Sequence, residues 1–361
     1  MWTTRPPGLR LACRFAWLLL ETSMIFLINR ILAFALTAAW LSSAAFAIER
    51  VAPESPTPWQ VDKHRFAAKK ANEAFSGFAC GTSGMCVLAV DEGRQGAFMR
   101  INGQRLVYVG EPFEFSGVEK ELDAEAAAVD GGYFYVAGSH AAKRETCCDN
   151  SDSRRVYRLT ADESGHIGTM THSERLWDAM RSLPELAPYA VPGDCRCDRA
   201  PGRNRIDIEG MGAANGRLFF ALRAPNVEGN GYVVSVDAKA LFEGGDLKPS
   251  LATVRLGANK GFRDLAIADG VALALVGPSD ALSPADYSIV ELRGLTTGVA
   301  VQPKELATID LQNAPLGKKG SLIKPEAIAV LELDPKRYRL LVLSDGGDDG
   351  APLVFNIPRK P

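Results

Sequence analysis

Five segments of the chain repeat one arrangement of apolar and polar positions. Each begins with a small or acidic residue and a short apolar stretch. A turn follows, and then a run of β-forming residues that ends in polar residues. Units of about fifty residues with room for four strands are typical of the blades of a β-propeller. The five β-forming runs are Met85–Val90, Tyr133–Ala137, Arg217–Leu222, Val271–Val276 and Arg339–Leu343.

Turn residues support this interpretation. Asp130-Gly131, Asn215-Gly216 and Asp269-Gly270 each separate two apolar stretches. These dipeptides are preferred in two-residue hairpin turns because Asn, Asp and Gly tolerate positive φ angles. Further strand-like runs follow at Arg155–Thr160, Tyr232–Asp237 and Ser288–Leu292.

The first residues of the repeated units indicate the number of blades. These anchors, which lie 49, 84, 55 and 62 residues apart, are Ser76, Glu125, Glu209, Asp264 and Glu326. The spacing predicts an all-β protein with a five-bladed propeller, and six blades with one eroded blade is the alternative. Only 35 residues follow the last anchor, so we expect an N-terminal strand near Trp59–Ala67 to complete that blade.

The longest interval between anchors carries extra sequence. It contains four cysteines and a predicted helix at Ser173–Leu183. We expect a disulfide-stapled, partly helical insertion at about residues 145–203, within a single propeller domain that spans residues 48–361.

The first 47 residues differ in composition from the rest. An apolar run from Ile25 to Ala47 ends in small residues, which predicts a secretory signal peptide with cleavage after Ala47. Met24–Ala47 alone makes a compact signal, so we expect the natural chain to start at Met24. The alternative is a membrane anchor, but the run from Ile31 to Ala47 has only 17 residues. We therefore expect a periplasmic or extracellular protein with no membrane span in the mature chain.

The charge of the mature chain excludes one class of partner. Removal of the first 47 residues, which carry four arginines and one glutamate, changes the formal net charge from −2 to −5. A mildly acidic chain with dispersed charges has no basic surface for nucleic acid. We expect a monomer whose partner is a small molecule or a protein ligand.

Six cysteines lie in the mature part of the chain. Cys80 and Cys86 flank a hairpin-sized loop and are expected to form a local disulfide. The other four are expected to form two bridges, whose pairing stays open, because an even count in an exported chain is typical of disulfides. A thiolate metal site is the alternative, which an oxidising compartment disfavours. These four are Cys147, Cys148, Cys195 and Cys197.

Acidic anchors predict a cluster of carboxylates. The first strand of each propeller blade lines the central channel, so Glu125, Glu209, Asp264 and Glu326 are expected at one mouth of that channel. Carboxylates this close repel one another unless a cation neutralises them, and their oxygen atoms favour Ca²⁺ or Mg²⁺. The alternative is that each acid binds backbone N–H groups or pairs with an arginine. The candidate arginines are Arg205, Arg223 and Arg263.

The ends of the β-forming runs predict a second polar ring. Arg223, with Lys143 and Arg144, is expected to bind a phosphate or carboxylate group. His140, with Asp91 or Glu92, is the candidate for general acid–base catalysis. The alternative is a solvated rim of charges. The ring consists of Asp91, Glu92, His140, Arg223, Asp280 and Asp345.

Several of these motifs together resemble an uncharacterised bacterial family of secreted proteins that is described as a domain of unknown function. The motifs include Phe75-Ser76-Gly77, Ile208-Glu209-Gly210 and Lys324-Pro325-Glu326. The resemblance implies a propeller-like fold and no particular activity. The acidic start of each blade is also distantly similar to the propellers of strictosidine synthase, paraoxonase and gluconolactonase, and to those of esterase-like phytases. In the first group such residues bind calcium on the axis, which implies Ca²⁺ as the candidate cofactor here.

Two functional hypotheses remain. The chain has no G-x-S-x-G nucleophile motif, no H-E-x-x-H zinc motif and no phosphate-binding Walker loop. The first hypothesis is an exported propeller that binds a ligand or partner at a charged channel mouth. The alternative is a calcium-dependent hydrolase of esters, lactones or phosphoesters.

Overall fold

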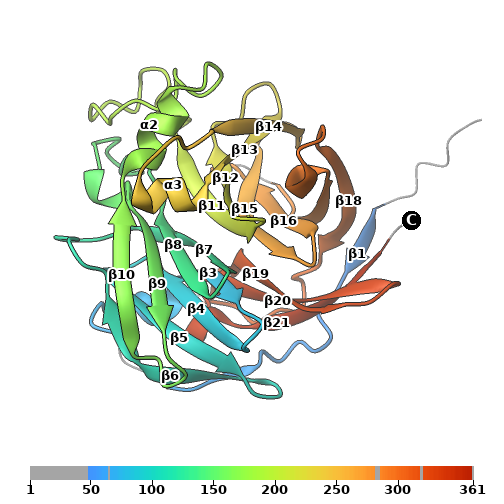
Figure 1. Cartoon of the computed structure of the whole chain (residues 1–361). Coiled ribbons are helices and arrows are strands. Elements are labelled where there is room, and N and C mark those ends of the chain that lie inside the picture. Colours follow the sequence, from blue (N-terminus) through green and yellow to red (C-terminus); the bar gives the residue numbers. More distant parts are fainter. Residues whose placement is uncertain (1–47, 64–65, 281–284, 318–319, 360–361) are drawn as a thin grey trace, which may run out of the picture. The chain divides into compact units, whose positions relative to one another are not determined.

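A computed structural model describes residues 48–359 apart from 64–65, 281–284 and 318–319. The predicted signal peptide therefore lies outside the described residues. Five small sheets surround a common centre, so the described residues form a five-bladed β-propeller (Figure 1). The predicted all-β fold class is confirmed, with five blades rather than six.

The first three blades have four antiparallel strands each, numbered from the axis outward. Blade 1 consists of β3 (Phe75–Cys80), β4 (Met85–Val90), β5 (Gln95–Ile101) and β6 (Arg105–Glu114), with β2 (Gln60–Val61) added in parallel at its outer edge. Blade 2 consists of β7 (Ala124–Asp130), β8 (Tyr133–Gly138), β9 (Val156–Ala161) and β10 (Ile167–Ser173). Blade 3 consists of β11 (Asp207–Ala214), β12 (Arg217–Ala224), β13 (Asn230–Asp237) and β14 (Ser250–Arg255).

The last two blades differ at their outer edges. Blade 4 consists of β15 (Lys260–Ala268), β16 (Val271–Pro278), β17 (Ser288–Arg293) and β18 (Gln302–Ile309), with β1 (Glu49–Val51) added in parallel. Blade 5 has three strands, β19 (Lys324–Leu333), β20 (Arg337–Asp345) and β21 (Leu353–Pro358). The helices are α2 (Arg175–Arg181) and α3 (Ala238–Glu243), with short 3₁₀ turns at Ala71–Glu73, Ser151–Ser153, Leu295–Thr297 and Asp348–Gly350. Within the described ranges, no helix is long and apolar enough to cross a bilayer.

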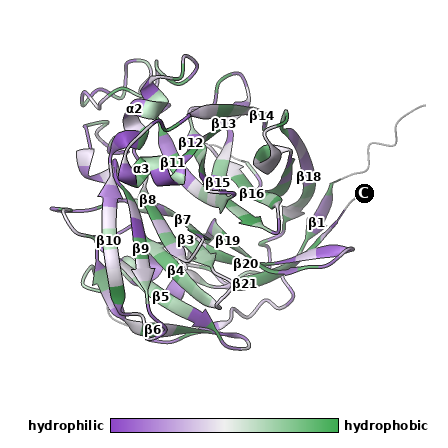
Figure 2. Ribbon diagram, viewed as in Figure 1, coloured by the Kyte–Doolittle hydropathy of each residue, from purple (hydrophilic) through white to green (hydrophobic). Residues whose placement is uncertain are grey.

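The hydrophobic core is divided among the five spaces between neighbouring blades. One apolar cluster fills each space, and Phe98 of blade 1 meets Phe134 of blade 2 with ring centroids 4.9 Å apart. Each blade therefore buries both of its faces, so its second strand is apolar on both sides, as β4 shows with all six residues buried. Green predominates on the strands that surround the centre in Figure 2. Because both faces are buried, the second strands are continuously apolar, and this pattern is what predicted them from the sequence.

The N-terminal segment does not complete blade 5 as expected. β1 pairs with β18 of blade 4 and β2 pairs with β6 of blade 1, so the chain between them passes along blade 5. Two backbone hydrogen bonds attach it there, from Glu54 N to Val354 O at 2.7 Å and from Trp59 N to Pro352 O at 2.8 Å. Three prolines lie in this passage and lack the N–H groups that a regular ladder requires. Residues 52–59 thus form a strap across blade 5 rather than its fourth strand.

The interval expected to hold one insertion also contains part of a blade. The predicted run Arg155–Thr160 corresponds to β9, so the two outer strands of blade 2 lie inside residues 145–203. The extra sequence forms two loops, residues 139–155 and 174–206, of which the second contains α2. Two disulfides join these loops, and the third closes the β3–β4 turn, so the three predicted bridges are present. The pairs are Cys147–Cys197, Cys148–Cys195 and Cys80–Cys86.

The adjacent disulfides are expected to stabilise the fold in a non-additive way. They close nearly the same loop, with sequence separations of 50 and 47 residues. Replacing all four cysteines with alanine should lower the free energy of unfolding by about 4 kcal/mol, because the unfolded chain regains the entropy of that loop. Replacing one pair should have a much smaller effect, since the other bridge still holds the loop ends together. Urea denaturation of the three variants tests this, and two equal, additive losses would contradict it.

Candidate functional site

Each inner strand has a β-bulge at the same position near its start. In all five pairings of the first and second strands, the register shifts by one residue there. A bulge re-aims the side chain of the extra residue relative to the regular alternation. All five bulge residues are buried, and we refer to them as the bulge ring. They are Ser76, Glu125, Glu209, Arg263 and Glu326.

Asp264, which the sequence analysis placed among the acids of this ring, has a different environment. The bulge residue of blade 4 is Arg263, one position earlier than the repeat spacing suggested. The carboxylate oxygens of Asp264 accept hydrogen bonds from the backbone N–H groups of Leu265 and Ile328, both at 2.7 Å. Because Ile328 belongs to β19, Asp264 joins blades 4 and 5. Spacing alone cannot locate a bulge to a single residue, which explains the difference.

The inner strands pack so closely that some positions exclude any side chain. A Cβ atom at Gly77 would lie 2.8 Å from the backbone of Ala126, and one at Gly210 would lie 2.6 Å from the backbone of Asp264. Both glycines directly follow a bulge residue. Glycine there lets neighbouring inner strands touch, and this contact brings the bulge ring together at one end of the channel.

Three members of the bulge ring belong to a buried ion network. Arg263 Nη2 donates to Glu326 Oε2 and lies 3.3 Å from Glu209 Oε2. Arg223 Nη1 donates to Glu209 Oε1 at 2.7 Å and lies 3.9 Å from Asp207 Oδ2. Glu209 and Glu326 therefore have arginine partners, which was the alternative to a bound cation.

The network separates the pKa values of its carboxyl groups. Burial would raise the pKa of Glu209, but the charges of Arg263, Arg223 and Arg144 outweigh burial and lower it to about 2. Burial raises the pKa of Glu326 to about 7, because the attraction of Arg263 only partly offsets it. Burial and the repulsion of Glu209 also raise the pKa of Asp207 to about 7. At neutral pH the network therefore contains an ionised carboxylate beside groups that can still give up a proton.

Two cavities of about 450 Å³ each share Arg144, Arg223 and Asp280 in their walls. The first, which we call the arginine cavity, combines charged groups with an apolar wall. Its other lining residues include Arg263, Glu326, Tyr287, Ile309, Leu311 and Ile323. The second, which we call the acidic cavity, is lined mainly by polar and charged groups. Its acids include Asp91, Glu92, Glu121, Asp123, Glu125 and Asp207.

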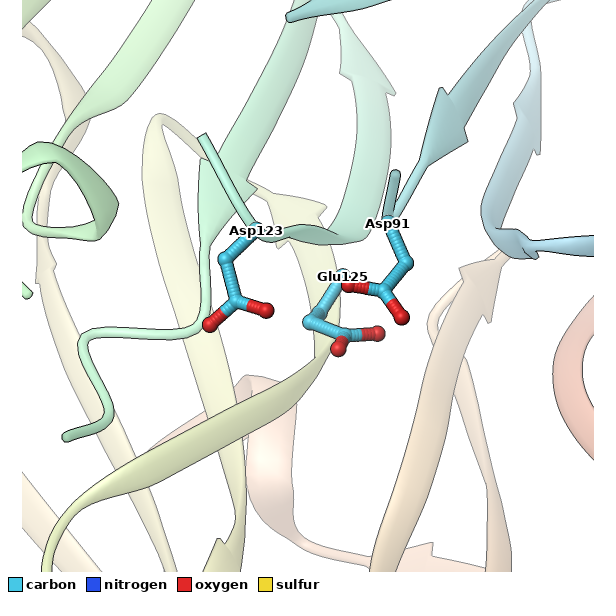
Figure 3. Close-up of side chains that lie close together, drawn as sticks. All are labelled: Asp91, Asp123 and Glu125. Atoms are coloured by element: carbon cyan, nitrogen blue, oxygen red, sulfur yellow. The ribbon is translucent and has the colours of Figure 1, made fainter. Parts of the chain in front are cut away.

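Three carboxyl groups that line the acidic cavity lie close together (Figure 3). Asp91, Asp123 and Glu125 each offer one oxygen, and these oxygens lie within 4.8 Å of one another. Asp91 follows β4 while Glu125 lies on β7, so this acidic cluster joins blades 1 and 2. Burial raises the pKa of all three, and repulsion by neighbouring carboxylates adds to the effect for Asp91 and Glu125.

The disulfide-linked loop positions two cations at the cavities. Lys143 N donates to Cys148 O at 2.9 Å, and Cys147 N donates to Lys143 O at 2.6 Å, so the cysteine pair shapes this loop. Lys143 lines the acidic cavity, and Arg144 lines both cavities. The structure thus brings together Arg223, Lys143 and Arg144, the three residues that the sequence analysis selected for anion binding.

His140 lines neither cavity among the described residues. Its ring is buried, with Nδ1 2.9 Å from Gly138 O and its centroid 6.5 Å from that of Trp177. Burial lowers the pKa of His140 to about 4, so the ring is neutral at pH 7. The structure therefore does not bring His140 together with Asp91 or Glu92, because this side chain packs into the core.

The remaining members of the predicted polar ring are dispersed. Glu92 lines the acidic cavity and lies 3.8 Å from Lys70, whereas Asp345 pairs with Lys324 at 2.9 Å. Asp280 lines both cavities.

Asp123 and Asp207 were not among the residues predicted from the sequence. Each lies two positions before a bulge residue, so Asp-Ala-Glu and Asp-Ile-Glu recur in consecutive units. This repeated Asp-x-Glu pattern was a signal from which both residues could have been found. Glu121 and Tyr287 had no comparable signal.

Glu326→Gln is expected to reduce the pH dependence of stability. The pKa of Glu326 is about 7 in the folded protein and 4.5 in its ordinary state, so the folded chain retains a proton that the unfolded chain loses. Stability is therefore lost as the pH rises from about 4.5 to about 7, by about 3 kcal/mol for this group. Chemical denaturation between these pH values should show a flatter profile for the variant.

The control for that experiment is Glu332→Gln. It removes an exposed acid of the same blade, which lies 3.7 Å from Arg337, and should leave the wild-type profile unchanged. Parallel profiles for wild type and Glu326→Gln would show that Glu326 titrates normally.

Comparison with solved structures finds matches over most of this chain at low sequence identity and with TM-scores below 0.5. The PQQ-bound aldose sugar dehydrogenase of Streptomyces coelicolor is 12% identical with a TM-score of 0.41, over 82% of this chain and 97% of that chain. An exo-β-1,3-galactanase of Clostridium thermocellum is 11% identical with a TM-score of 0.45, and the match spans 84% of this chain and 62% of that one. The α-L-arabinofuranosidase of Podospora anserina, in complex with cellotriose, is 11% identical with a TM-score of 0.44, over 87% and 98% of the two chains. These are not the propeller groups to which the sequence was distantly similar.

Sequence comparison identifies the family. No curated protein matches the chain. Residues 95–167 and 154–350 match the model of a family described as a protein of unknown function, DUF3616. The match covers most of the propeller and confirms the resemblance to a domain of unknown function. This chain therefore belongs to the DUF3616 family.

Proposed function

We propose that this protein binds a small organic anion in the arginine cavity. The observation that carries the proposal is the exposure of Arg144, whose side chain lines both cavities and is 56% exposed. Arg223 and Arg263 already contact carboxylates at 3.3 Å or less, whereas among the described residues the carboxylate nearest to Arg144 is that of Glu209, at 3.9 Å. The Arg144 guanidinium therefore retains donors for a carboxylate or phosphate group, which it can bind in a bidentate manner.

The rest of the cavity lining indicates the chemical character of the anion beyond its charged group. Tyr287, Ile309 and Ile323 supply an apolar wall beside the charged groups. A volume of about 450 Å³ lies within the range of small-molecule sites, which combine apolar walls with a few polar groups. The ligand that fits this lining best is a compact organic acid or phosphate ester with an apolar body.

We place this binding outside the cytoplasm. Three disulfides support that location, because such bridges persist mainly in oxidising compartments. The proposal also includes the predicted signal peptide and a monomeric state.

Arg144→Gln is expected to weaken anion binding at least tenfold, because a charge-assisted hydrogen bond to a charged group contributes about 1.5–3 kcal/mol. A panel of aromatic and aliphatic carboxylates and phosphate monoesters, screened by thermal shift and measured by calorimetry, provides the probes. Arg181→Gln is the matched control, since its side chain is 58% exposed but lies on α2, away from both cavities. Equal affinities in wild type and Arg144→Gln, or no binding by any probe, would reject the proposal.

Hydrolysis of esters, lactones or phosphoesters is the second candidate function. The observation that favours it is the contact of Glu209 and Glu326 with one arginine, together with pKa values of about 2 and about 7. A carboxyl group that titrates near neutral pH suits general acid–base catalysis, and Glu326 lines the arginine cavity.

If the protein is such a hydrolase, Glu326→Gln should lower kcat by about a hundredfold or more. The assay uses p-nitrophenyl acetate, p-nitrophenyl phosphate and a γ-lactone, each with CaCl₂ or with EDTA. Glu332→Gln is the control, and wild-type kcat should change with a midpoint near pH 7. Full activity of Glu326→Gln would exclude this residue as the proton donor. Glu209→Gln is less informative because it removes a buried charge that two buried arginines, Arg223 and Arg263, both contact.

A further inference from the structure

We infer that Asp91, Asp123 and Glu125 together hold one divalent cation of the size of Ca²⁺. This site lies in the acidic cavity and is independent of the proposed anion site. It differs from the metal site expected from the sequence, because only Glu125 is common to both.

The distances within the acidic cluster fit that ion. Three oxygens no more than 4.8 Å apart all lie within about 2.8 Å of a common centre, close to the 2.3–2.6 Å of Ca–O bonds. Mg²⁺ requires about 2.0–2.1 Å, so the cluster would have to contract further around it. Ca²⁺ takes six to eight oxygen ligands, and the acidic cavity has room for the waters that would complete its shell.

Glu125 gives the independent indication of a ligand. This residue is 5% exposed, and no hydrogen bond or ion pair within 4 Å joins its carboxyl group to another described residue, although Arg144 attracts it from farther away. Figure 3 shows its carboxyl group directed to the same space as those of Asp91 and Asp123. Buried carboxylates are normally paired or bound to a metal, because an unpaired buried charge is strongly destabilising.

Comparison within the bulge ring strengthens this point. Glu209 and Glu326 occupy equivalent positions in other blades, and each has an arginine within contact distance. No arginine of blade 2 lies within contact distance of Glu125, which instead lies beside the carboxyl groups of Asp91 and Asp123. A divalent cation would provide the missing positive charge, and Lys143 in the same cavity would offset the remaining negative charge.

Calorimetry on the mature chain after EDTA treatment tests the inference. CaCl₂ titrated at physiological salt should bind one equivalent and raise the melting temperature. Glu125→Gln should lower Ca²⁺ affinity at least tenfold, yet in EDTA it should melt at or above the wild-type temperature, because it no longer buries an unbalanced carboxylate. Mg²⁺ should bind at least tenfold more weakly than Ca²⁺.

Glu92→Gln is the matched control, because Glu92 lines the same cavity but lies beside Lys70. It should keep the wild-type Ca²⁺ affinity, and Asp91→Asn should lose it if Glu125→Gln does not fold. Absence of saturable Ca²⁺ binding, or equal losses in Glu92→Gln and Glu125→Gln, would overturn the site. Either result leaves anion binding at Arg144 to be judged by its own experiment.

Discussion

Direct contact between the inner strands is the constraint on which the site depends. Gly77 and Gly210 leave no space for a Cβ atom, so adjacent blades meet backbone to backbone around the axis. At that distance the side chains of the bulge ring necessarily lie close to one another. Charged residues at these positions must therefore be balanced locally, and the arrangement of arginines and acids at the channel mouth follows from that requirement.

The buried charges are arranged differently on the two sides of the channel mouth. Between blades 3, 4 and 5, Arg223 and Arg263 neutralise Glu209 and Glu326 within the protein itself. Between blades 1 and 2, the carboxyl groups around Glu125 are held together without an equivalent arginine. The two cavities consequently differ in character although they share part of their walls.

The sequence predicted the architecture better than the site. Second strands such as Met85–Val90 were recognisable because burial on both faces makes them continuously apolar, and hairpin turns separated them clearly. The site depends on details that periodicity does not carry. The bulge residue of blade 4 is Arg263 rather than Asp264. His140 is buried in the protein rather than exposed at the ends of the strands. Asp123 lies in the connection before β7, where the strand pattern does not extend.

The strap formed by residues 52–59 has a consequence for how the molecule folds. Glu54 accepts hydrogen bonds from Arg339 at 2.7 and 2.9 Å and from Asn356 at 2.9 Å, across 285 and 302 residues of chain. Contacts of such high sequence separation carry a large loop-closure entropy and form slowly. Residues 52–59 must therefore meet strands that lie almost three hundred residues later in the sequence before the strap is attached to blade 5. We expect this closure of the circle of blades to be a late and slow step of folding.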